Sequence, residues 1–368
     1  MNILAIETSC DDTCVAIVEI RGKKNPKFNI LANIVSSQVK IHTKWGGVYP
    51  TLAKREHQKN LPLVLKRVLK KAGNQKINLI AVTVGPGLEP CLWVGVNFAK
   101  DLAQNWDLPI IPINHIEAHI YANWLNPQLE RAVGQADITL RKAETPVLGW
   151  RPTICLIVSG GHTQLILMKN HGDYKILGET RDDAAGECFD KVARILGLGY
   201  PGGPAIAAQA KAYRGPASVT LPRPMIYQKN YDFSFSGLKT AVLYHFRSQK
   251  PEIRKSKGYI RKMAAETQQA VIDVLIHKTL KVAKNYKVKT IILGGGVVAN
   301  EELRKQFKQK LDATHHPFNF LVPPKNLCTD NAVMVAVTAY YHWLREKTKI
   351  QRLAAGHPEV RANANLRL

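Results

Sequence analysis

One pattern, strand, turn and strand, occurs twice in this sequence and limits the fold more than any other feature. The first copy is NILAIETSCDDTCVAIVEI at residues 2–20, and the second is TICLIVSGGHTQLILMK at residues 153–169. Each is an apolar run with β-branched residues, a polar turn and a second apolar run, which is typical of two paired strands. Gly160 and Gly161 in the second turn can adopt backbone angles that other residues avoid.

A second pair of segments recurs in the same order along the chain. LIAVTVGPGLEPCLWVGVNFAKDLA at residues 79–103 and TIILGGGVVANEELRKQFKQKL at residues 290–311 are each typical of a strand, a glycine loop and a helix. The two repeats predict an α/β protein with two duplicated lobes and a ligand in the cleft between them. Two unrelated lobes are the alternative, because hairpins and glycine loops are common.

These repeats place the domain boundaries. We expect the first lobe at residues 1–122, with residues 328–348 packing back on it, and the second lobe at residues 123–327. Within the second lobe, residues 126–152 have weak periodicity, which indicates a surface insertion or a short helix over the cleft. The end of the chain, residues 349–368, is basic without a sustained apolar face, so we expect a flexible tail or a segment that contacts RNA.

Charge and composition narrow the class of protein. The formal net charge is +24, which favours polyanionic partners such as nucleic acids. The six cysteines form no CxxC pair, and the N-terminal segment MNILAIETSCDDT lacks the apolar run of a signal peptide. No run of about 18 uncharged apolar residues occurs, so we expect a cytoplasmic protein without a membrane span.

The segment NHIEAH suggests a metal site. His115 and His119 are four residues apart, so on a helix they share one face and can bind one ion. Asp330, in CTDNA at the start of another predicted helix, is the best candidate for a third ligand, and two imidazoles with one carboxylate suit Fe(II) or zinc. In zinc proteases a Glu directly follows the first His, but here that residue is Ile116. Glu117 lies about 200° around the helix from His115, which disfavours a peptidase and indicates a supporting or helix-start acid.

Other turns suit a nucleotide. The backbone N–H groups of VSGGHT and the hydroxyls of ETSCDDT can face a phosphate, although Asp11 and Asp12 would repel a bare one. The loop LGGGVVANEE can approach a base and ribose closely, but it matches neither a Walker motif nor GxGxxG. Asp190, on a predicted helix near the turn YPGGP, could bind ribose hydroxyls or cap a helix.

Nine motifs in order across residues 6–332 resemble one family. They are IETSCDDT, GPGL, HIEAH, VSGGHTQLI, DDAAGECFDK, YPGGP, DFSFSGLKT, GGGVVAN and CTDNA. The sequence closely resembles the bacterial tRNA threonylcarbamoyladenosine transferases, the TsaD family. The resemblance implies two duplicated actin-like (RNase H-like) lobes, as in actin, Hsp70 and the sugar kinases.

The resemblance also implies a reaction and its site residues. A threonylcarbamoyl group would move from threonylcarbamoyl-AMP to the exocyclic amine of the adenosine 3′ of the anticodon, in tRNAs that read codons beginning with A, and AMP would leave. His115, His119 and Asp330 would bind one divalent metal, Fe(II) or zinc, and Asp11 matches a family acid near the phosphates. The residues that would bind the adenylate are Ile157, Val158, Ser159, Gly160, Gly161, Asp190, Gly203 and Asn300.

The implied partners are tRNA, a paralogous subunit without the metal histidines, a P-loop ATPase and an upstream threonylcarbamoyl-AMP synthase. The nucleotide ligand would be ATP or threonylcarbamoyl-AMP. Asp12, Thr51, Glu89 and Pro90 depart from the usual family pattern. Two other functions stay open at this point. They are a metallopeptidase, disfavoured by Ile116, and a non-catalytic ATP-binding module, which would bind ATP without modifying tRNA.

Overall fold

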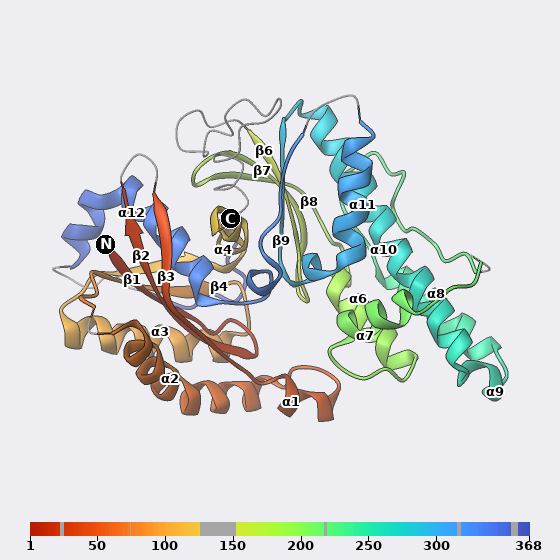
Figure 1. The fold of residues 1–368 in the computed structure, drawn as a ribbon, viewed down its shortest axis with the longest axis horizontal. Helices are drawn as coiled ribbons and strands as arrows, with labels where there is room; N and C mark the ends of the chain where they lie inside the picture. Colours follow the sequence, from red (N-terminus) through yellow and green to blue (C-terminus); the bar gives the residue numbers. More distant parts are fainter. Residues whose placement is uncertain (23–25, 74, 126–151, 217–218, 315–317, 355–359) are drawn as a thin grey trace. The chain divides into compact units, whose positions relative to one another are not determined.

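The computed structural model describes residues 1–22, 26–73, 75–125, 152–216, 219–314, 318–354 and 360–368 (Figure 1). The chain forms two compact units. Unit 1 comprises Met1–Ile41, Val48–Trp150 and Pro323–Leu368, and unit 2 comprises His42–Gly47 and Arg151–Val322. The C-terminal helix is therefore part of the same unit as the N-terminal strands. The expected insertion, 126–152, falls almost wholly outside the described residues.

The strands are β1 (Asn2–Glu7), β2 (Asp12–Arg21), β3 (Lys27–Ser37), β4 (Leu79–Gly85), β5 (Ile110–Asn114), β6 (Thr153–Val158), β7 (Thr163–Asn170), β8 (Asp173–Glu179), β9 (Thr290–Gly294) and β10 (Asn319–Leu321). The α-helices are α1 (Val39–His42), α2 (Pro50–Ala72), α3 (Glu89–Trp106), α4 (His115–Tyr121), α6 (Ala185–Ile195), α7 (Gly202–Lys211), α8 (Ser236–Ser248), α9 (Pro251–Arg254), α10 (Lys257–Asn285), α11 (Glu301–Asp312) and α12 (Ala332–Ala354). The 3-10 helices are η1 (Thr43–Trp45), η2 (Ala122–Leu125), η3 (Gly296–Ala299) and η4 (Lys325–Leu327). None of the described helices is long and apolar enough to cross a membrane.

The two units contain the same sheet. In unit 1 the order is β3-β2-β1-β4-β5, and in unit 2 it is β10-β9-β6-β7-β8. β1 pairs antiparallel with β2 and parallel with β4, and β6 pairs antiparallel with β7 and parallel with β9. This correspondence confirms the predicted duplication and the actin-like α/β fold class.

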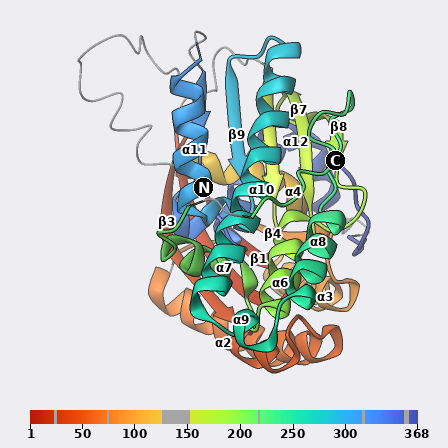
Figure 2. The same ribbon diagram turned by 90° about the vertical axis from the view of Figure 1, so that its right-hand side faces the viewer.

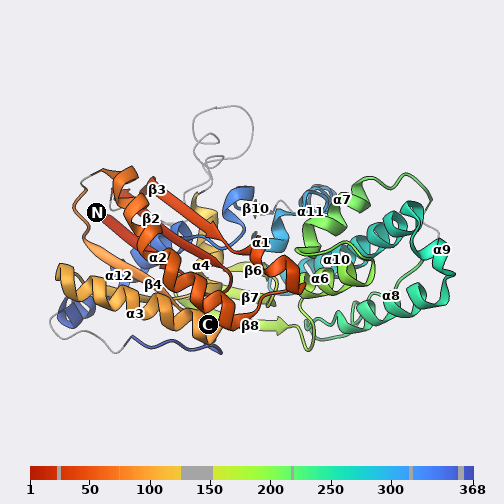
Figure 3. The same ribbon diagram turned by 90° about the horizontal axis from the view of Figure 1, so that it is seen from below.

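The sheet of unit 1 is covered on both faces. Helix α2 packs on one face of this sheet, against β2 and β3 (Figure 3). Leu4 and Ile6 of β1 belong to the same apolar core as Leu61 and Val64 of α2. Side chains alternate along a strand, so the equally buried Ile3 points to the other face, where α12 packs on β1 and β2. Burial on both faces explains why residues 3–6 of β1 are all apolar instead of alternating with polar residues.

In unit 2 a layer of helices lies beside the sheet. The long helix α10 packs along α7, and α6 packs against both α7 and α8 (Figure 2). Among the side chains that fix this layer are Phe233 and Phe235, which are fully buried and stacked with their ring centroids 6.3 Å apart. The polar and aromatic motif DFSFSGLKT therefore supplies packing at the start of α8.

The end of the chain differs from the expected flexible tail. Residues 360–368 lie against unit 1, where Val360 is only 2% exposed and Leu366 packs on the apolar core. The backbone N–H of Asn363 donates a hydrogen bond of 2.7 Å to the carbonyl oxygen of Val84 at the end of β4. Single apolar residues and backbone pairing hold the segment, and neither produces the periodic pattern by which a helix or strand is predicted.

Candidate functional site

Two capped helix starts position the predicted metal ligands in unit 1. Asn114 ends β5, and its side-chain oxygen accepts hydrogen bonds of 2.8 and 3.2 Å from two N–H groups of the next turn, so α4 begins at His115. Asn331 likewise accepts a 3.0 Å hydrogen bond from the first turn of α12. Asp330 directly precedes that cap. The histidines therefore lie in the first two turns of α4, and the carboxylate lies just before α12.

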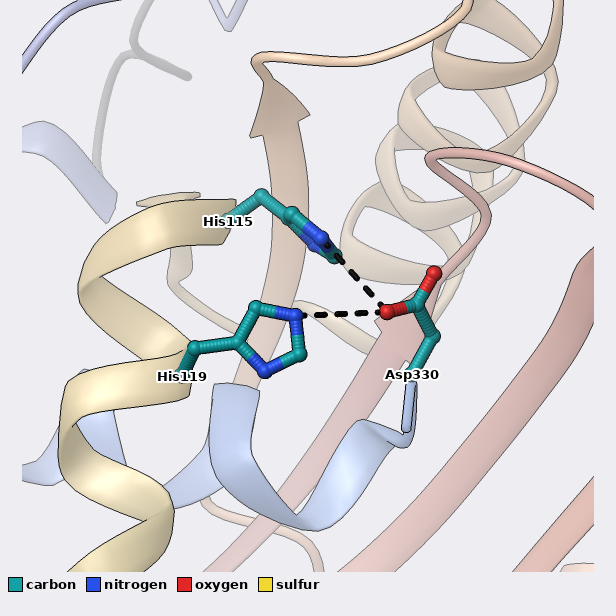
Figure 4. Close-up of side chains that lie close together, drawn as sticks. All are labelled: His115, His119 and Asp330. Carbon is teal, nitrogen blue, oxygen red and sulfur yellow. Dashed lines mark ion pairs between the residues drawn. The ribbon is translucent and has the colours of Figure 1, made fainter. Parts of the chain in front are cut away.

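The structure brings His115, His119 and Asp330 together (Figure 4). Their possible ligand atoms lie within 4.8 Å of one another. Asp330 Oδ1 is 3.5 Å from His115 Nε2 and 3.3 Å from His119 Nε2. The histidines are buried, and the carboxylate side chain is 23% exposed. Two imidazole nitrogens and one carboxylate oxygen facing one point form a donor set that suits a divalent transition metal with further positions open.

The hydrogen bonding of His119 supports this assignment. His119 is fully buried, and among the described residues Nδ1 has no hydrogen-bond partner, while Nε2 has only the Asp330 carboxylate nearby, at 3.3 Å. A buried polar atom without a partner costs about 1–3 kcal/mol, so native proteins seldom leave one. The lone pair on Nε2 faces the same point as the Asp330 carboxylate, and a metal ion there would satisfy it.

Glu7, the last residue of β1, orients His115 and was missed from the sequence. Its carboxylate is fully buried and accepts hydrogen bonds from the N–H of Ser9 at 2.5 Å, from Thr83 Oγ1 at 2.7 Å and from His115 Nδ1 at 2.9 Å. A proton fixed on Nδ1 leaves the lone pair of Nε2 free to bind a metal, as in carboxylate–histidine–metal arrangements. One feature of the sequence could have identified Glu7, namely an acid at the end of an apolar run. Burying a carboxylate there costs free energy unless the carboxylate is paired.

Carboxylates dominate the electrostatics of this cluster. Burial lowers the pKa of His115, but the charges of Glu7 and Asp330 outweigh it and raise that pKa to about 9. Burial lowers the pKa of His119. Burial, with repulsion from Asp330 and other nearby carboxylates, raises the pKa of Asp12 to about 7. This excess of negative charge favours a bound cation, which would displace the proton from His115.

Glu117 points away from the three ligands, as the helix geometry predicted. Its Oε2 lies 2.8 Å from Nε2 of His342, so it joins α4 to α12. The position after His115 is held by Ile116, which is buried and apolar. The cluster therefore lacks the general base of a zinc peptidase in its usual place. His342 was also missed, because nothing in the sequence of α12 shows which of its faces meets α4.

Asp11 lies in the turn after β1, in the same unit as the metal cluster. His57 of α2 forms hydrogen bonds on both sides of this turn. Its Nδ1 is 2.8 Å from Thr13 Oγ1, and its Nε2 is 2.9 Å from the carbonyl oxygen of Cys10. The carbonyl oxygen of Asp11 accepts a hydrogen bond of 3.1 Å from the N–H of Gln38. The backbone of Asp11 is therefore held on both sides, and its side chain is half-buried.

The predicted adenylate residues all lie in unit 2. Ile157 and Val158 are fully buried in β6, so only their backbone could meet a ligand. The turn that follows is tight, since the N–H of Ser159 donates to the carbonyl oxygen of His162 at 2.8 Å. Gly160 and Gly161 at its tip are exposed, and a Cβ on either would have no atom within 4 Å. Their N–H groups are therefore open to a ligand.

Two further segments lie beside this turn. The N–H of Gly186 in α6 donates to the carbonyl oxygen of Ser159 at 3.2 Å. A Cβ on Gly186 would be 2.5 Å from that oxygen, so only glycine permits this approach. Residue Ile157 is paired with Gly294 of β9, so the glycine loop after β9 begins next to the end of β6. The ends of adjacent parallel strands are the usual ligand position in such sheets.

Asp190 and Asn300 have structural partners. Asp190 Oδ1 accepts a 2.7 Å hydrogen bond from the N–H of Gly202, which is the capping role that the sequence left open beside ribose binding. The side-chain oxygen of Asn300 caps α11 at 3.0 Å, and its amide donates to Gln268 Oε1 at 2.8 Å. Gly203 follows in the first turn of α7, half-buried and with open space where a Cβ would be.

Comparison with known proteins shows that the sequence is similar to one family over most of its length. The family model of TsaD, described as tRNA N6-adenosine threonylcarbamoyltransferase, matches residues 29–134 and 137–337. A protein of that name from Thermomicrobium roseum is 45% identical over 93% of this chain and 92% of its own length. Another, from Persephonella marina, is 44% identical over 98% of this chain and 96% of its own length.

Solved structures share the fold at low sequence identity. Full-length HypF in the phosphate- and nucleotide-bound form matches with a TM-score of 0.55 and 14% identity, covering 93% of this chain. HypF from T. kodakarensis matches with a TM-score of 0.56 and 12% identity, covering 94%. This chain spans 46% and 48% of those two HypF chains. Because the sequence identities are so low, the similarity shows a shared fold and nothing more.

Proposed function

The chain belongs to the TsaD family of tRNA N6-adenosine threonylcarbamoyltransferases, and on that basis we propose that it modifies the adenosine 3′ of the anticodon in tRNA. The acyl donor is threonylcarbamoyl-AMP and the acceptor is the exocyclic N6 amine. The tRNAs are those that read codons beginning with A. The observation that carries the proposal is the match of the family model across both units, joined to the buried cluster of His115, His119 and Asp330.

The reaction is an acyl transfer. The N6 amine attacks the carbamoyl carbon and forms a C–N bond, while the bond from that carbon to the phosphate oxygen breaks. AMP leaves with the electron pair, and the amine releases a proton to solvent. A mixed anhydride is already activated, so no protein nucleophile is required. Positioning the two reactants is then the main task of the protein, and it can supply a large part of the rate enhancement.

His115, His119 and Asp330 would hold one divalent metal, Fe(II) or zinc, with Glu7 fixing the imidazole of His115. Such an ion supplies a Lewis acid that polarises a carbonyl or anchors the oxygens of the substrate. Asp11 lies on the turn that follows Glu7, and we assign it to the phosphate end of threonylcarbamoyl-AMP. Solvent would separate its carboxylate from the phosphate. Glu117 and His342 keep α4 against α12, so that the spacing of the ligands is preserved.

Unit 2 would bind the adenylate. Gly160 and Gly161 at the tip of the turn, and Gly203 at the start of α7, offer backbone N–H groups that can face an anion. Ile157, Val158 and Ser159 would contribute by holding that turn at the end of β6. Asp190 and Asn300 would contribute by holding α7 and α11 in place, since their side chains are engaged there.

Charge, chemistry and family membership each indicate partners of this protein. The net charge of +24 favours the phosphate backbone of tRNA, and the reaction belongs in the cytoplasm, where tRNA matures. A separate synthase must supply the labile adenylate, and the family implies a paralogous subunit and a P-loop ATPase as further partners.

The test is reconstitution. The purified chain, unmodified tRNA, threonine, bicarbonate, ATP and the partner enzymes are incubated, and the tRNA nucleosides are then measured by mass. We expect threonylcarbamoyladenosine to form only when the chain is present. Absence of the product, with a known relative active in parallel, would refute the proposed function. Release of peptides from a protein substrate, lost in His115→Ala, would favour a peptidase instead.

A further inference from the structure

One end of the helical layer of unit 2 carries a dense group of positive charges. It spans the end of α8, all of α9 and the start of α10 (Figure 1). Residues 247–262 contain one acid, Glu252, and seven basic residues, which we call the basic cap. The basic cap consists of Arg247, Lys250, Arg254, Lys255, Lys257, Arg261 and Lys262.

Within the described residues, the side chains of the basic cap have no acidic partners. Four of them are exposed and three are half-buried, and none forms an ion pair within the part of the chain that the structure describes. Elsewhere in the same unit, some surface lysines do have such partners. Lys169 lies 3.7 Å from Asp173, and Lys211 lies 3.5 Å from Glu301. The cations of the basic cap are therefore available to an external anion.

The position of the basic cap is unfavourable for the helix that carries it. Lys257, Arg261 and Lys262 occupy the first turns of α10, and no acid lies in its first turn. The N-terminus of a helix carries a partial positive charge, so cations there destabilise it and acids are usually preferred. A site that opposes local stability in this way indicates a functional use of the charge.

Aromatic side chains accompany these charges. Tyr244 lies one turn before Arg247 on α8 and is 65% exposed. The guanidinium of Arg254 lies over the ring of Phe246, 5.4 Å from its centroid, which keeps this side chain ordered. Exposed rings beside unpaired cations are typical of surfaces that bind unpaired bases and the phosphate backbone of RNA together.

We propose that the basic cap, with Tyr244, is a docking surface for tRNA. This inference rests on the proposed function and adds to it a specific surface, on unit 2, at which the nucleic acid substrate is held. Arg247, Lys250 and Lys255 contact backbone phosphates, and Tyr244 stacks on a base or a ribose face. These contacts give affinity that depends on salt and adds nothing to the chemical step.

The test compares two triple charge reversals in the full chain. The first is Arg247→Glu, Lys250→Glu and Lys255→Glu in the basic cap. The matched control reverses three lysines of unit 2 that have acidic partners, Lys169, Lys211 and Lys305. Both variants change the net charge by the same amount. Binding of unmodified tRNA is measured by fluorescence anisotropy at several salt concentrations, after thermal melts show that both variants fold.

We expect the basic-cap variant to bind tRNA at least about tenfold more weakly at 0.15 M salt. The salt slope, which is the steepness with which the logarithm of the binding constant falls with the logarithm of the salt concentration, should decrease by about 2–3, since each phosphate contact contributes about 0.7–0.9 to it. The control should stay within about threefold of the unchanged chain. Tyr244→Ala should weaken binding about fivefold or more while leaving the salt slope unchanged. Equal affinities for the two triple variants would overturn the proposal.

Reaction kinetics separate this proposal from the proposed function. In the reconstituted reaction the basic-cap variant should show a raised KM for tRNA and an unchanged kcat at saturating tRNA. A chain that makes no threonylcarbamoyladenosine at all would refute the proposed function, whatever its affinity for tRNA. A basic-cap variant with an unchanged KM would refute the docking surface alone.

Discussion

Replacing Glu7 by Gln tests how the metal cluster is built. Glu7 receives three hydrogen bonds, of 2.5, 2.7 and 2.9 Å, and is fully buried. Glutamine has the same shape, but its amide nitrogen donates where the carboxylate accepted. The pair of donors Thr83 Oγ1 and His115 Nδ1 would then face another donor, and His115 would move its proton to Nε2, the atom assigned to the metal. Loss of a supporting carboxylate typically weakens metal binding 10- to 100-fold, or about 1.4–2.8 kcal/mol.

The assay is competition between the protein and a chelator for zinc, followed by metal analysis of the desalted protein. Glu19→Gln is the matched control, because Glu19 is a strand acid that pairs with Arg21 at the surface and lies at the opposite end of the β1–β2 pair from Glu7. We expect weakened binding only in Glu7→Gln, with an unchanged circular dichroism spectrum. Equal zinc affinity in Glu7→Gln and the control would refute the view that Glu7 orients His115.

Three further changes test other parts of the structure. Glu117→Ala removes the partner of His342 and should lower the free energy of unfolding by about 1–3 kcal/mol in urea, while metal still binds. Gly186→Ala places a Cβ 2.5 Å from the carbonyl oxygen of Ser159, so nucleotide affinity measured by calorimetry should fall at least about tenfold. Deleting residues 360–368 exposes apolar core and should cost about 1.5–3 kcal/mol or more of unfolding free energy.

For each of these three changes, one outcome would contradict the prediction. Loss of bound metal in Glu117→Ala would mean that this acid supports a ligand directly. For Gly186→Ala the control is Gly258→Ala, where a Cβ would have no atom within 4 Å, and equal nucleotide affinities would show that the close approach is unimportant. An unchanged urea midpoint after the deletion would mean that the end of the chain contributes nothing to unit 1.

The sequence predicted the features that recur at fixed spacing. The two hairpins gave the duplicated sheets, and the four-residue spacing of His115 and His119 gave the face of α4 that meets Asp330. Glu117 could be placed off that face, because a helix of known pitch fixes the angle between residues.

The features that it did not predict depend on contacts distant in sequence. Glu7 meets His115 across 108 positions, and Glu117 meets His342 across 225, and no local pattern marks such pairs. The docked segment at residues 360–368 is held by backbone pairing and single apolar side chains, which composition alone describes as a tail. The engaged side chains of Asp190 and Asn300 likewise became visible only once their neighbours were placed.

The most direct test of the central claim measures product and metal in the same samples. Wild-type chain is stripped with a chelator, reloaded with Fe(II) or zinc, and compared with Asp330→Ala in the reconstituted reaction. Because Asp330 is partly exposed and precedes α12, its loss should leave the fold intact. We expect threonylcarbamoyladenosine to track bound metal in the wild type and to stay absent from Asp330→Ala after reloading. Equal product from the stripped and reloaded wild type would contradict the account.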